Sequence, residues 1–279
     1  MTNTHSVRGT GYIADPVGHR YNAFRAVHPA HRMGAAALPD SGGPGEFAPP
    51  IWDQDGTSSC VGHAFAGALT ELCASEAVTL PAPVSPRGCY FLSRAIDRAA
   101  NAGPLPTLTD DGAMPHSAAR ALQIYGIPLE GDNASDRKAT DPDYTTWLAA
   151  HVNDELKLGE FEAEDSRRIL TDWTSIYDGD PDKVQLLVQA LAAGFPAVAA
   201  VDASTAEFQS YDGTKTLALT GRNPNHMICI DFYEKNSAGL YMPRLRNSWS
   251  RSWGNQGYAW VDPRSIADGM FSVLIPHLL

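Results

Sequence analysis

The chain has few cysteines, no long apolar run and no excess of basic residues. Four cysteines in 279 residues are too few for a disulfide scaffold. No apolar run reaches the roughly 18 residues needed to cross a membrane, and the first twelve residues hold no apolar stretch typical of a secretory signal. With 21 Lys+Arg against 32 Asp+Glu, the net charge is -11, which disfavours nucleic-acid binding. We therefore expect no membrane and no nucleic-acid partner, and a location in the cytoplasm or export by a route without a signal peptide.

The chain does contain enough apolar sequence for a large core. Hydrophobic residues make up 43% of it and charged residues 19%, which fits one large domain or two lobes. An apolar stripe at helical spacing begins after Ser58 or Ser59, either of which could cap the helix. Further helices are predicted over 86–100, 115–125 and 181–193. A short apolar strand follows from residue 197, and alternating strands follow after Gly221. Helices first and strands last, without a βαβ rhythm, predict an α+β fold.

The composition divides the chain into an N-terminal arm and one larger domain. Residues 1–50 are rich in Gly, Pro, Ala and His and show no sustained period, so we expect an extended arm. Residues 51–279 would form the domain, with a helical lobe over about 51–130 and a β-rich lobe over about 185–279. The polar segment 130–185 between them is predicted to hold surface insertions.

One cysteine lies in a setting that suits a nucleophile. Cys60 follows a Gly/Ser/Thr turn and opens a predicted helix, where the helix dipole favours a thiolate. A small buried residue at a helix start is the structural alternative, and Cys73, Cys89 and Cys229 are expected to be core thiols of that kind. Cys60 and His63 have a spacing seen at zinc sites, but no second ligand pair follows, so no metal is expected.

Residues around and far beyond Cys60 complete a recognisable pattern. Gln54 precedes Cys60 by six residues in WDQDGTSSCVGHAFA, and His226 lies in PNHMICIDFY. Asn247 begins NSWSRSWGNQGY, in which two Trp, two Gly and a Tyr recur at a fixed spacing. Together these segments resemble the papain-like cysteine peptidases, and the short-arm bacterial forms look closest. The resemblance covers about residues 48–126 and 185–275 and implies a two-lobe fold with the active cleft between the lobes.

The resemblance implies a role for each matching residue. Cys60 would be the nucleophile and His226 its base, oriented by Asn247 under the indole of Trp249. Gln54 and the Cys60 backbone N–H would bind the oxyanion. No cofactor is implied. His63 is a rival base, but as a neighbour on the helix of Cys60 it is badly placed to face the sulfur.

The family likeness also predicts the substrate site and the partner. The partner would be a peptide or protein substrate, and the chain is expected to cut it at internal bonds, as an endopeptidase does. Uncharged pocket walls predict an apolar side chain at P2, the second residue on the amino side of the scissile bond. The expected substrate-binding residues, besides Trp249, are Gly112, Ala113, Met114, Ala200, Asn225 and Met227.

Several departures from the family pattern leave alternatives open. Thr57 occupies the position of a family disulfide cysteine, Ser58-Ser59 replaces Gly-Ser, and Ser250 replaces a Gly. His226 follows Cys60 by 166 residues, more than the roughly 130–150 typical of the family. The same machinery could transfer its acyl group to an amine, as in a ligase, cyclase or transamidase. A non-catalytic binding protein on a decayed peptidase scaffold is the other alternative.

The arm is predicted to cover part of the cleft, as the N-terminal segments of zymogens do. An extended segment can bind a cleft through main-chain hydrogen bonds. Tyr12, Ile13, Tyr21 and Phe24 are the expected anchors. A flexible tail is the alternative.

Overall fold

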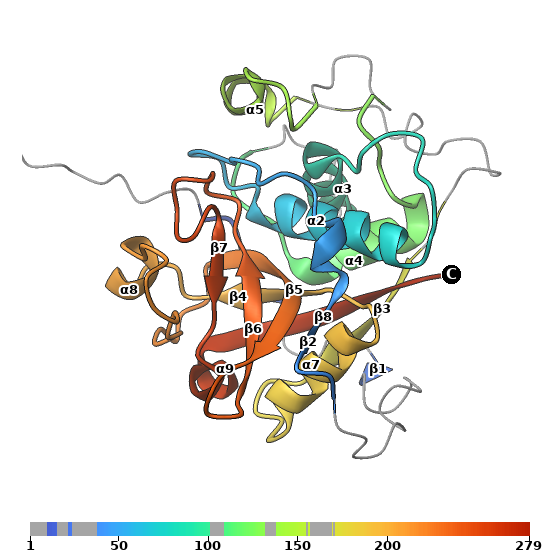
Figure 1. The fold of residues 1–279 in the computed structure, drawn as a ribbon. Helices are drawn as coiled ribbons and strands as arrows, with labels where there is room; N and C mark the ends of the chain where they lie inside the picture. The colour runs from blue at the N-terminus through green and yellow to red at the C-terminus, as the bar shows by residue number, and fades with distance from the viewer. Residues whose placement is uncertain are drawn as a thin grey trace, which may run out of the picture.

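The computed structural model describes residues 10–15, 22–23, 38–100, 109–131, 138–154, 156, 169 and 171–279. The helices between residues 60 and 151 lie in the upper part of the view, and a large sheet with three further helices around it lies in the lower part (Figure 1). The α+β, two-lobe architecture expected from the sequence is therefore confirmed. Tyr21 and Phe24, the two outer anchors predicted for the arm, lie outside the described residues.

Two helices of the helical lobe, α3 (Pro86–Ala100) and α4 (Pro115–Tyr125), begin and end where the sequence predicts. A proline occupies the first turn of α3 and of α4, where a missing N–H costs nothing, and Gly126 ends α4 with φ 79°. Ser59 is the N-cap of α2, but its hydroxyl makes no capping bond to the helix and instead contacts Thr57. The helices of this lobe and its flanks are a short 3-10 helix η2 (Pro44–Phe47), α2 (Cys60–Ser75), α3 (Pro86–Ala100), α4 (Pro115–Tyr125) and α5 (Tyr144–His151).

The β-rich lobe is built on one large sheet. In the described residues its strand order is β1-β3-β8-β4-β5-β6-β7, with β2 paired to β5, and every pairing except β1–β3 is antiparallel. The strands are β1 (Asn22–Ala23), β2 (Ser41–Gly42), β3 (Thr171–Ile176), β4 (Ala197–Val201), β5 (His226–Lys235), β6 (Tyr241–Arg246), β7 (Tyr258–Trp260) and β8 (Met270–Leu278). The helices of this lobe are α7 (Lys183–Ala192), α8 (Ala206–Gln209) and α9 (Pro263–Gly269).

Two features of the segment 130–185 differ from the prediction. Strand β3 belongs to the sheet, so the β-rich lobe begins before residue 185. Residues 138–154 are not confined to the surface, because Tyr144 and Leu148 are buried in the hydrophobic core around α2. The guanidinium of Arg87 on α3 also donates to the His151 carbonyl at the end of α5.

Strand alternation explains how α2 comes to lie against the sheet. Ala197, Ala199 and Val201 of β4 point into the core shared with α7, whereas Val198 and Ala200 point into the core around α2. Helix α2 is buried over most of its surface, so it forms the centre of the molecule rather than an outer layer (Figure 1). This packing brings the first residue of α2 to the start of β5.

No helix in the described part of the chain is long and apolar enough to span a membrane.

Candidate active site

Cys60 is the first residue of α2 and is fully buried. Backbone groups of Met227 and Gly11 lie close enough to its sulfur to favour the thiolate, which places the thiol beside the residue that follows His226. These groups lower the thiol pKa, but burial outweighs them and raises the pKa of Cys60 to about 12. The predicted nucleophile therefore lies between the start of β5 and the N-terminal arm.

His226 and Asn247 form a buried pair across two neighbouring strands. Nε2 of His226 lies 2.8 Å from Oδ1 of Asn247, and the Nδ1 atom is buried without a hydrogen-bond partner among the described residues. The indole of Trp249 packs on the imidazole with ring centroids 4.8 Å apart and is itself 1% exposed. The bond to Asn247 fixes the orientation of the ring and leaves Nδ1 as the nitrogen available for a proton.

Burial keeps both groups neutral in this arrangement. It lowers the pKa of His226 to about 4, although the hydrogen bond to Asn247 acts in the opposite direction. With the thiol pKa raised at the same time, a neutral thiol and a neutral imidazole are the favoured forms near pH 7. Forming a thiolate–imidazolium pair therefore requires transfer of the Cys60 proton to His226 and a more solvated site.

Gln54 lies next to both halves of the site. Its Nε2 donates to the Thr57 carbonyl at 2.7 Å, and its Oε1 accepts from the Ser248 hydroxyl at 2.6 Å. Its backbone N–H also donates to the Ser248 carbonyl. The side chain is thus fixed between the turn that precedes Cys60 and the residue that follows Asn247.

The rival base, His63, is turned toward the body of its own lobe. Its Nδ1 lies 3.0 Å from the Ser59 carbonyl, one turn back along α2. Its ring lies edge-on to Trp52 and to Tyr144, with centroids 6.2 and 6.3 Å away. Burial lowers the pKa of His63 to about 4, so it is a neutral core residue near pH 7.

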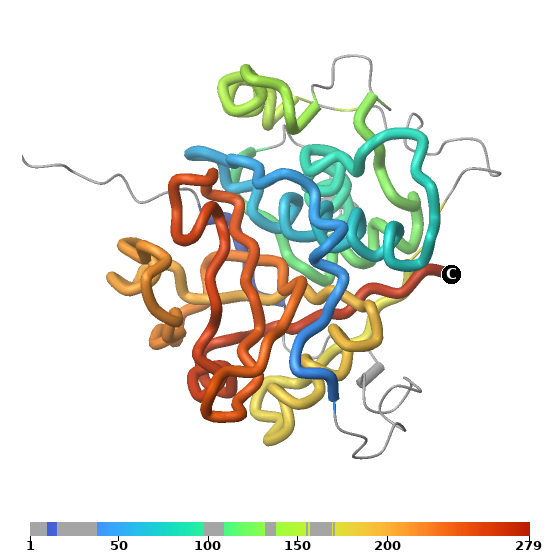
Figure 2. Tube along the Cα trace, in the orientation of Figure 1, coloured from blue at the N-terminus to red at the C-terminus, as the bar shows by residue number. Residues whose placement is uncertain are grey.

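Residues 11–13 of the arm bond to both lobes, and the later part of the arm, the blue tube that begins at residue 38, passes between the sheet and α2 (Figure 2). On one side the Ala113 N–H donates to the Gly11 carbonyl at 2.8 Å, and the Ile13 N–H donates to the Ala113 carbonyl at 3.0 Å. On the other side the Tyr12 N–H donates to the Asn225 carbonyl at 3.2 Å. Backbone groups of two predicted substrate-binding residues therefore bind the arm.

The side chain of Tyr12 lies beside these backbone contacts, against the core around α2. It packs against the hydrophobic cluster that contains Ala113, Ala200 and Met227. Its hydroxyl lies 2.9 Å from the Ser272 hydroxyl on β8. Three predicted pocket residues are thus brought together.

Met114, also predicted to line the pocket, is not part of this cluster. It is the N-cap of α4, and its carbonyl accepts a bond from Ser93. Gly112 has φ 98°, and a Cβ there would overlap the Gly11 carbonyl oxygen, so the arm needs a glycine at that position.

The structure adds residues that the sequence did not single out. Ser272 lies in β8, and the pairing of β8 with β4 shifts register between Val198 and Ala200, an irregularity of the kind that re-aims side chains. Asp110 accepts hydrogen bonds from the turn before Cys60. No local pattern marks either residue, although Asp110 lies two residues before the glycine assigned to the cleft wall.

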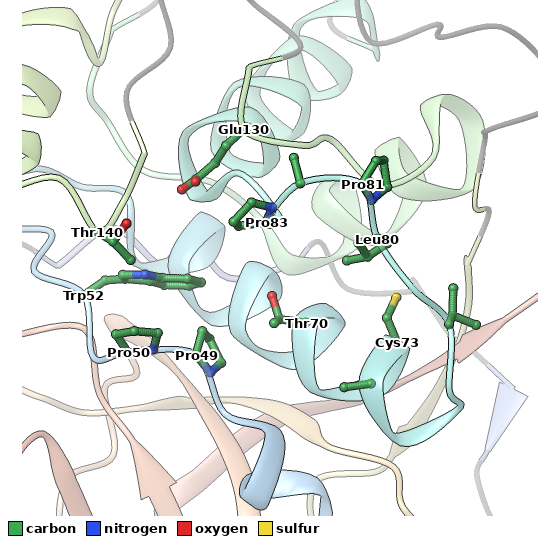
Figure 3. Close-up of a pocket in the computed structure, with 13 residues that line it drawn as sticks. Pro49, Pro50, Trp52, Thr70, Cys73, Leu80, Pro81, Pro83, Glu130 and Thr140 are labelled. Atoms are coloured by element: carbon green, nitrogen blue, oxygen red, sulfur yellow. The ribbon is translucent and has the colours of Figure 1, made fainter.

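A separate hollow of about 440 Å³ lies along α2 (Figure 3). Trp52 and prolines form part of its rim, and Thr70 and Cys73 of α2 form part of its floor. None of the described residues that line it belongs to the predicted site. The described residues also contain no group of three or more His, Cys, Asp or Glu able to hold a metal ion.

Comparison with known proteins identifies the family. The model of the papain family cysteine protease matches residues 110–269, which is more than half of the chain. The chain belongs to this family. The matched segment contains His226, Asn247 and Trp249, whereas Cys60 and Gln54 precede it.

Two curated relatives match short segments of the chain. Fruit bromelain of Ananas comosus is 41% identical over 63 residues, which cover 23% of this chain and 18% of bromelain. Cysteine protease 1 of Oryza sativa subsp. japonica is 30% identical over 83 residues, covering 29% and 17%. The matched segments thus span less than a fifth of either relative.

Solved structures extend the likeness over the whole fold. Xylellain, a cysteine protease from Xylella fastidiosa, superimposes with a TM-score of 0.71 at 21% identity, covering 99% of this chain and 98% of xylellain. Digestive procathepsin L 3 of Tenebrio molitor gives 0.63 at 20% identity, covering 97% and 76%. Bromelain of Ananas comosus gives 0.62 at 17% identity, covering 87% and 100%.

Proposed function

We propose that the protein is a cysteine peptidase that hydrolyses peptide bonds through a thioester. The observation that carries this proposal is the His226–Asn247 pair. Nδ1 of His226 is buried, and the backbone of the next residue, Met227, lies beside the Cys60 sulfur. A nucleophile, a base and a group that orients the base are the parts that acyl transfer requires. Membership of the family supports the same assignment.

Each group has a defined step in this chemistry. Cys60 gives its proton to Nδ1 of His226, and the thiolate attacks the peptide carbonyl carbon to form a tetrahedral adduct. The Cys60 N–H and the Gln54 Nε2 stabilise the oxyanion. The adduct collapses, the C–N bond breaks, and His226 returns the proton to the leaving amine. Water, deprotonated by His226, then hydrolyses the thioester and restores the thiol.

The path of the arm supports cleavage of internal peptide bonds rather than removal of terminal residues. Residues 10–15 pass between the lobes with chain continuing on both sides, and backbone bonds to Ala113 and Asn225 hold them there. An extended substrate binding to the same backbone groups would also enter and leave the site. We therefore propose an endopeptidase.

The surroundings of the Tyr12 side chain support an apolar preference at P2. The core that Tyr12 packs against includes Ala113, Ala200 and Met227, which carry no charge, so an ionic side chain would be desolvated there without a partner.

The arm itself is proposed to act as an inhibitor in its own chain. A Gly11 backbone group lies beside the Cys60 sulfur, and the Tyr12 side chain packs against the core that contains the residues proposed to hold P2. Any substrate must displace these residues to reach the thiol. One of the solved structures similar to this chain is that of a procathepsin.

The test is a cleavage profile on a peptide library, with Cys60→Ala as the matched control. The wild-type chain is expected to cleave internal bonds and the variant none. Equal cleavage by both would assign the activity to a contaminant and contradict the proposal.

Two additions to the same assay separate the alternatives. Product masses in the presence of an added amine distinguish hydrolysis from acyl transfer. A thiol-reactive epoxide that fails to label Cys60 in any condition, together with absent cleavage, would favour a non-catalytic binding protein.

A further inference from the structure

The turn that carries the nucleophile is tied to the opposite wall of the substrate site by a carboxylate. The backbone N–H of Ser58, two residues before Cys60, donates to both carboxylate oxygens of Asp110, each at 3.0 Å. Asp110 lies two residues before Gly112 and three before Ala113, whose backbone holds the arm. The hydrogen bond between Ser58 and Asp110 therefore links the turn that carries Cys60 to the segment that binds the arm.

A buried tyrosine closes this connection. The hydroxyl of Tyr90 donates to Oδ1 of Asp110 at 2.9 Å and accepts from the Gly112 N–H at 3.0 Å. Tyr90 is fully buried on α3, and the Arg94 guanidinium lies over its ring, 3.9 Å from the centroid. Arg94 also donates to the Thr109 carbonyl at 3.0 Å. Helix α3 thereby holds the segment that carries Asp110 and Gly112.

No covalent bond secures the same turn. All four cysteines are free, and Thr57 stands where a family disulfide would start. The Thr57 hydroxyl bonds only within its own turn, to the Gln54 carbonyl and the Ser59 hydroxyl. Among the hydrogen bonds that Ser58 and Thr57 make within the described part of the chain, those to Asp110 join the turn to the wall.

We propose that Asp110 and Tyr90 are positioning residues that set the distance between the Cys60 turn and the Gly112–Ala113 wall. This inference rests on the proposed function and adds that reaction with ligands bound along the wall depends on Asp110 and Tyr90. Ligands that bind along Ala113 and react at Cys60 need both surfaces in register. Small reagents that react at the thiol alone do not. Within the described part of the chain, neither Asp110 nor Tyr90 makes a hydrogen bond to the Cys60 sulfur or to the bound arm.

The experiment compares two alkylating agents on the full chain carrying Gly11→Ala, which removes competition from the arm. Iodoacetamide reports the thiol alone, and a Phe-Ala dipeptidyl chloromethyl ketone reports binding along the wall followed by reaction. The readout is the ratio of the two second-order rate constants, which the fraction of active protein does not affect. Tyr90→Phe deletes one oxygen and keeps the ring under Arg94, and Asp110→Ala deletes the acceptor.

Both variants are expected to lower the chloromethyl ketone to iodoacetamide ratio by about tenfold, because lost hydrogen bonds and small misplacements have effects of this size. Asp110→Asn keeps one acceptor oxygen and should recover part of the loss. Combining Tyr90→Phe with Asp110→Ala should add little to either alone, since both break one connection. Tyr241→Phe, which removes the bond to the Leu38 carbonyl, is the matched control and should leave the ratio unchanged.

An unchanged ratio in Tyr90→Phe and Asp110→Ala would overturn the inference, as would an equal loss in Tyr241→Phe. The result is independent of the proposed peptidase activity. If the protein reacts with both agents but cleaves no peptide, the proposed function fails while the ratio still decides the role of Asp110 and Tyr90.

Discussion

Gly11 and Ser58 meet backbone to backbone, although 47 positions separate them in the chain. A Cβ on Gly11 would overlap the carbonyl carbon and oxygen of Ser58, in the turn that leads to Cys60. Backbone atoms of a helix-start turn cannot move aside cheaply. The fit of the arm over the nucleophile therefore depends on the absence of a side chain at one residue.

Gly11→Ala is expected to release the arm and raise turnover of small peptides at least several-fold per active thiol, because the methyl group overlaps Ser58. Thiol titration and initial rates on the full chain measure this. Gly56→Ala is the matched control, since a Cβ at Gly56 would meet nothing within 4 Å. Equal rates for wild type and Gly11→Ala would show that the arm does not restrict access.

The two buried histidines should differ sharply in their effect on catalysis. His226→Ala is expected to lower kcat/KM by about 10³-fold or more, because it removes the base. His63→Ala should retain activity within about tenfold per active thiol, since its Nδ1 faces Ser59 rather than the sulfur. Kinetics normalised by thiol titration decide between them. An inactive His63→Ala beside an active His226→Ala would reverse the assignment.

The pocket beside the wall predicts which peptides are cut. Substrates with Tyr, Phe or Leu at P2 should exceed those with Arg or Glu by at least about tenfold, because the walls offer an ion no partner. A library varied only at P2 measures this, and a preference for Arg or Glu would contradict it.

Ser272→Ala should lower the cleavage rate of substrates with Tyr at P2, relative to those with Phe, by a few-fold through loss of one hydrogen bond.

Acid should destabilise the folded chain through its buried neutral histidines. Burial lowers the pKa of His63 to about 4 from an ordinary value of 6.5, so the unfolded state binds this proton first as the pH falls. The contribution of His63 to stability is complete above about pH 6.5 and is lost progressively down to about pH 4, by up to about 3 kcal/mol.

His63→Gln isolates that contribution. Burial raises the pKa of Glu71 and Asp231, which acts in the opposite direction on the wild type, so only the difference between the chains is informative. Urea unfolding at pH 7 and pH 4.5 should show a smaller loss of stability in the variant than in the wild type. Parallel losses in the two chains would show that His63 is already protonated or exposed.

The local structure could be read from the sequence because its signals are local. Pro86 and Pro115 mark helix starts, and Gly126 marks a helix end. A short apolar run marks β4, and alternation after Gly221 marks the later strands. The pairing of His226 with Asn247 was also predictable, because both lie in segments that match the family pattern. The extension of the sheet to β3 was not, since 130–185 is polar and gives no clear period.

The sequence by itself determined the α+β class, the helix that begins at Cys60 and the residues that could act with it. The tertiary structure alone decided what surrounds them. Tyr12 reaches Ser272 across 260 positions, and the Ser58 amide finds Asp110 across 52. Such contacts are fixed by how the lobes pack and how strands register, and no short-range pattern of residue types encodes them. Burial, and with it the neutral state of Cys60 and His226, follows from the same packing.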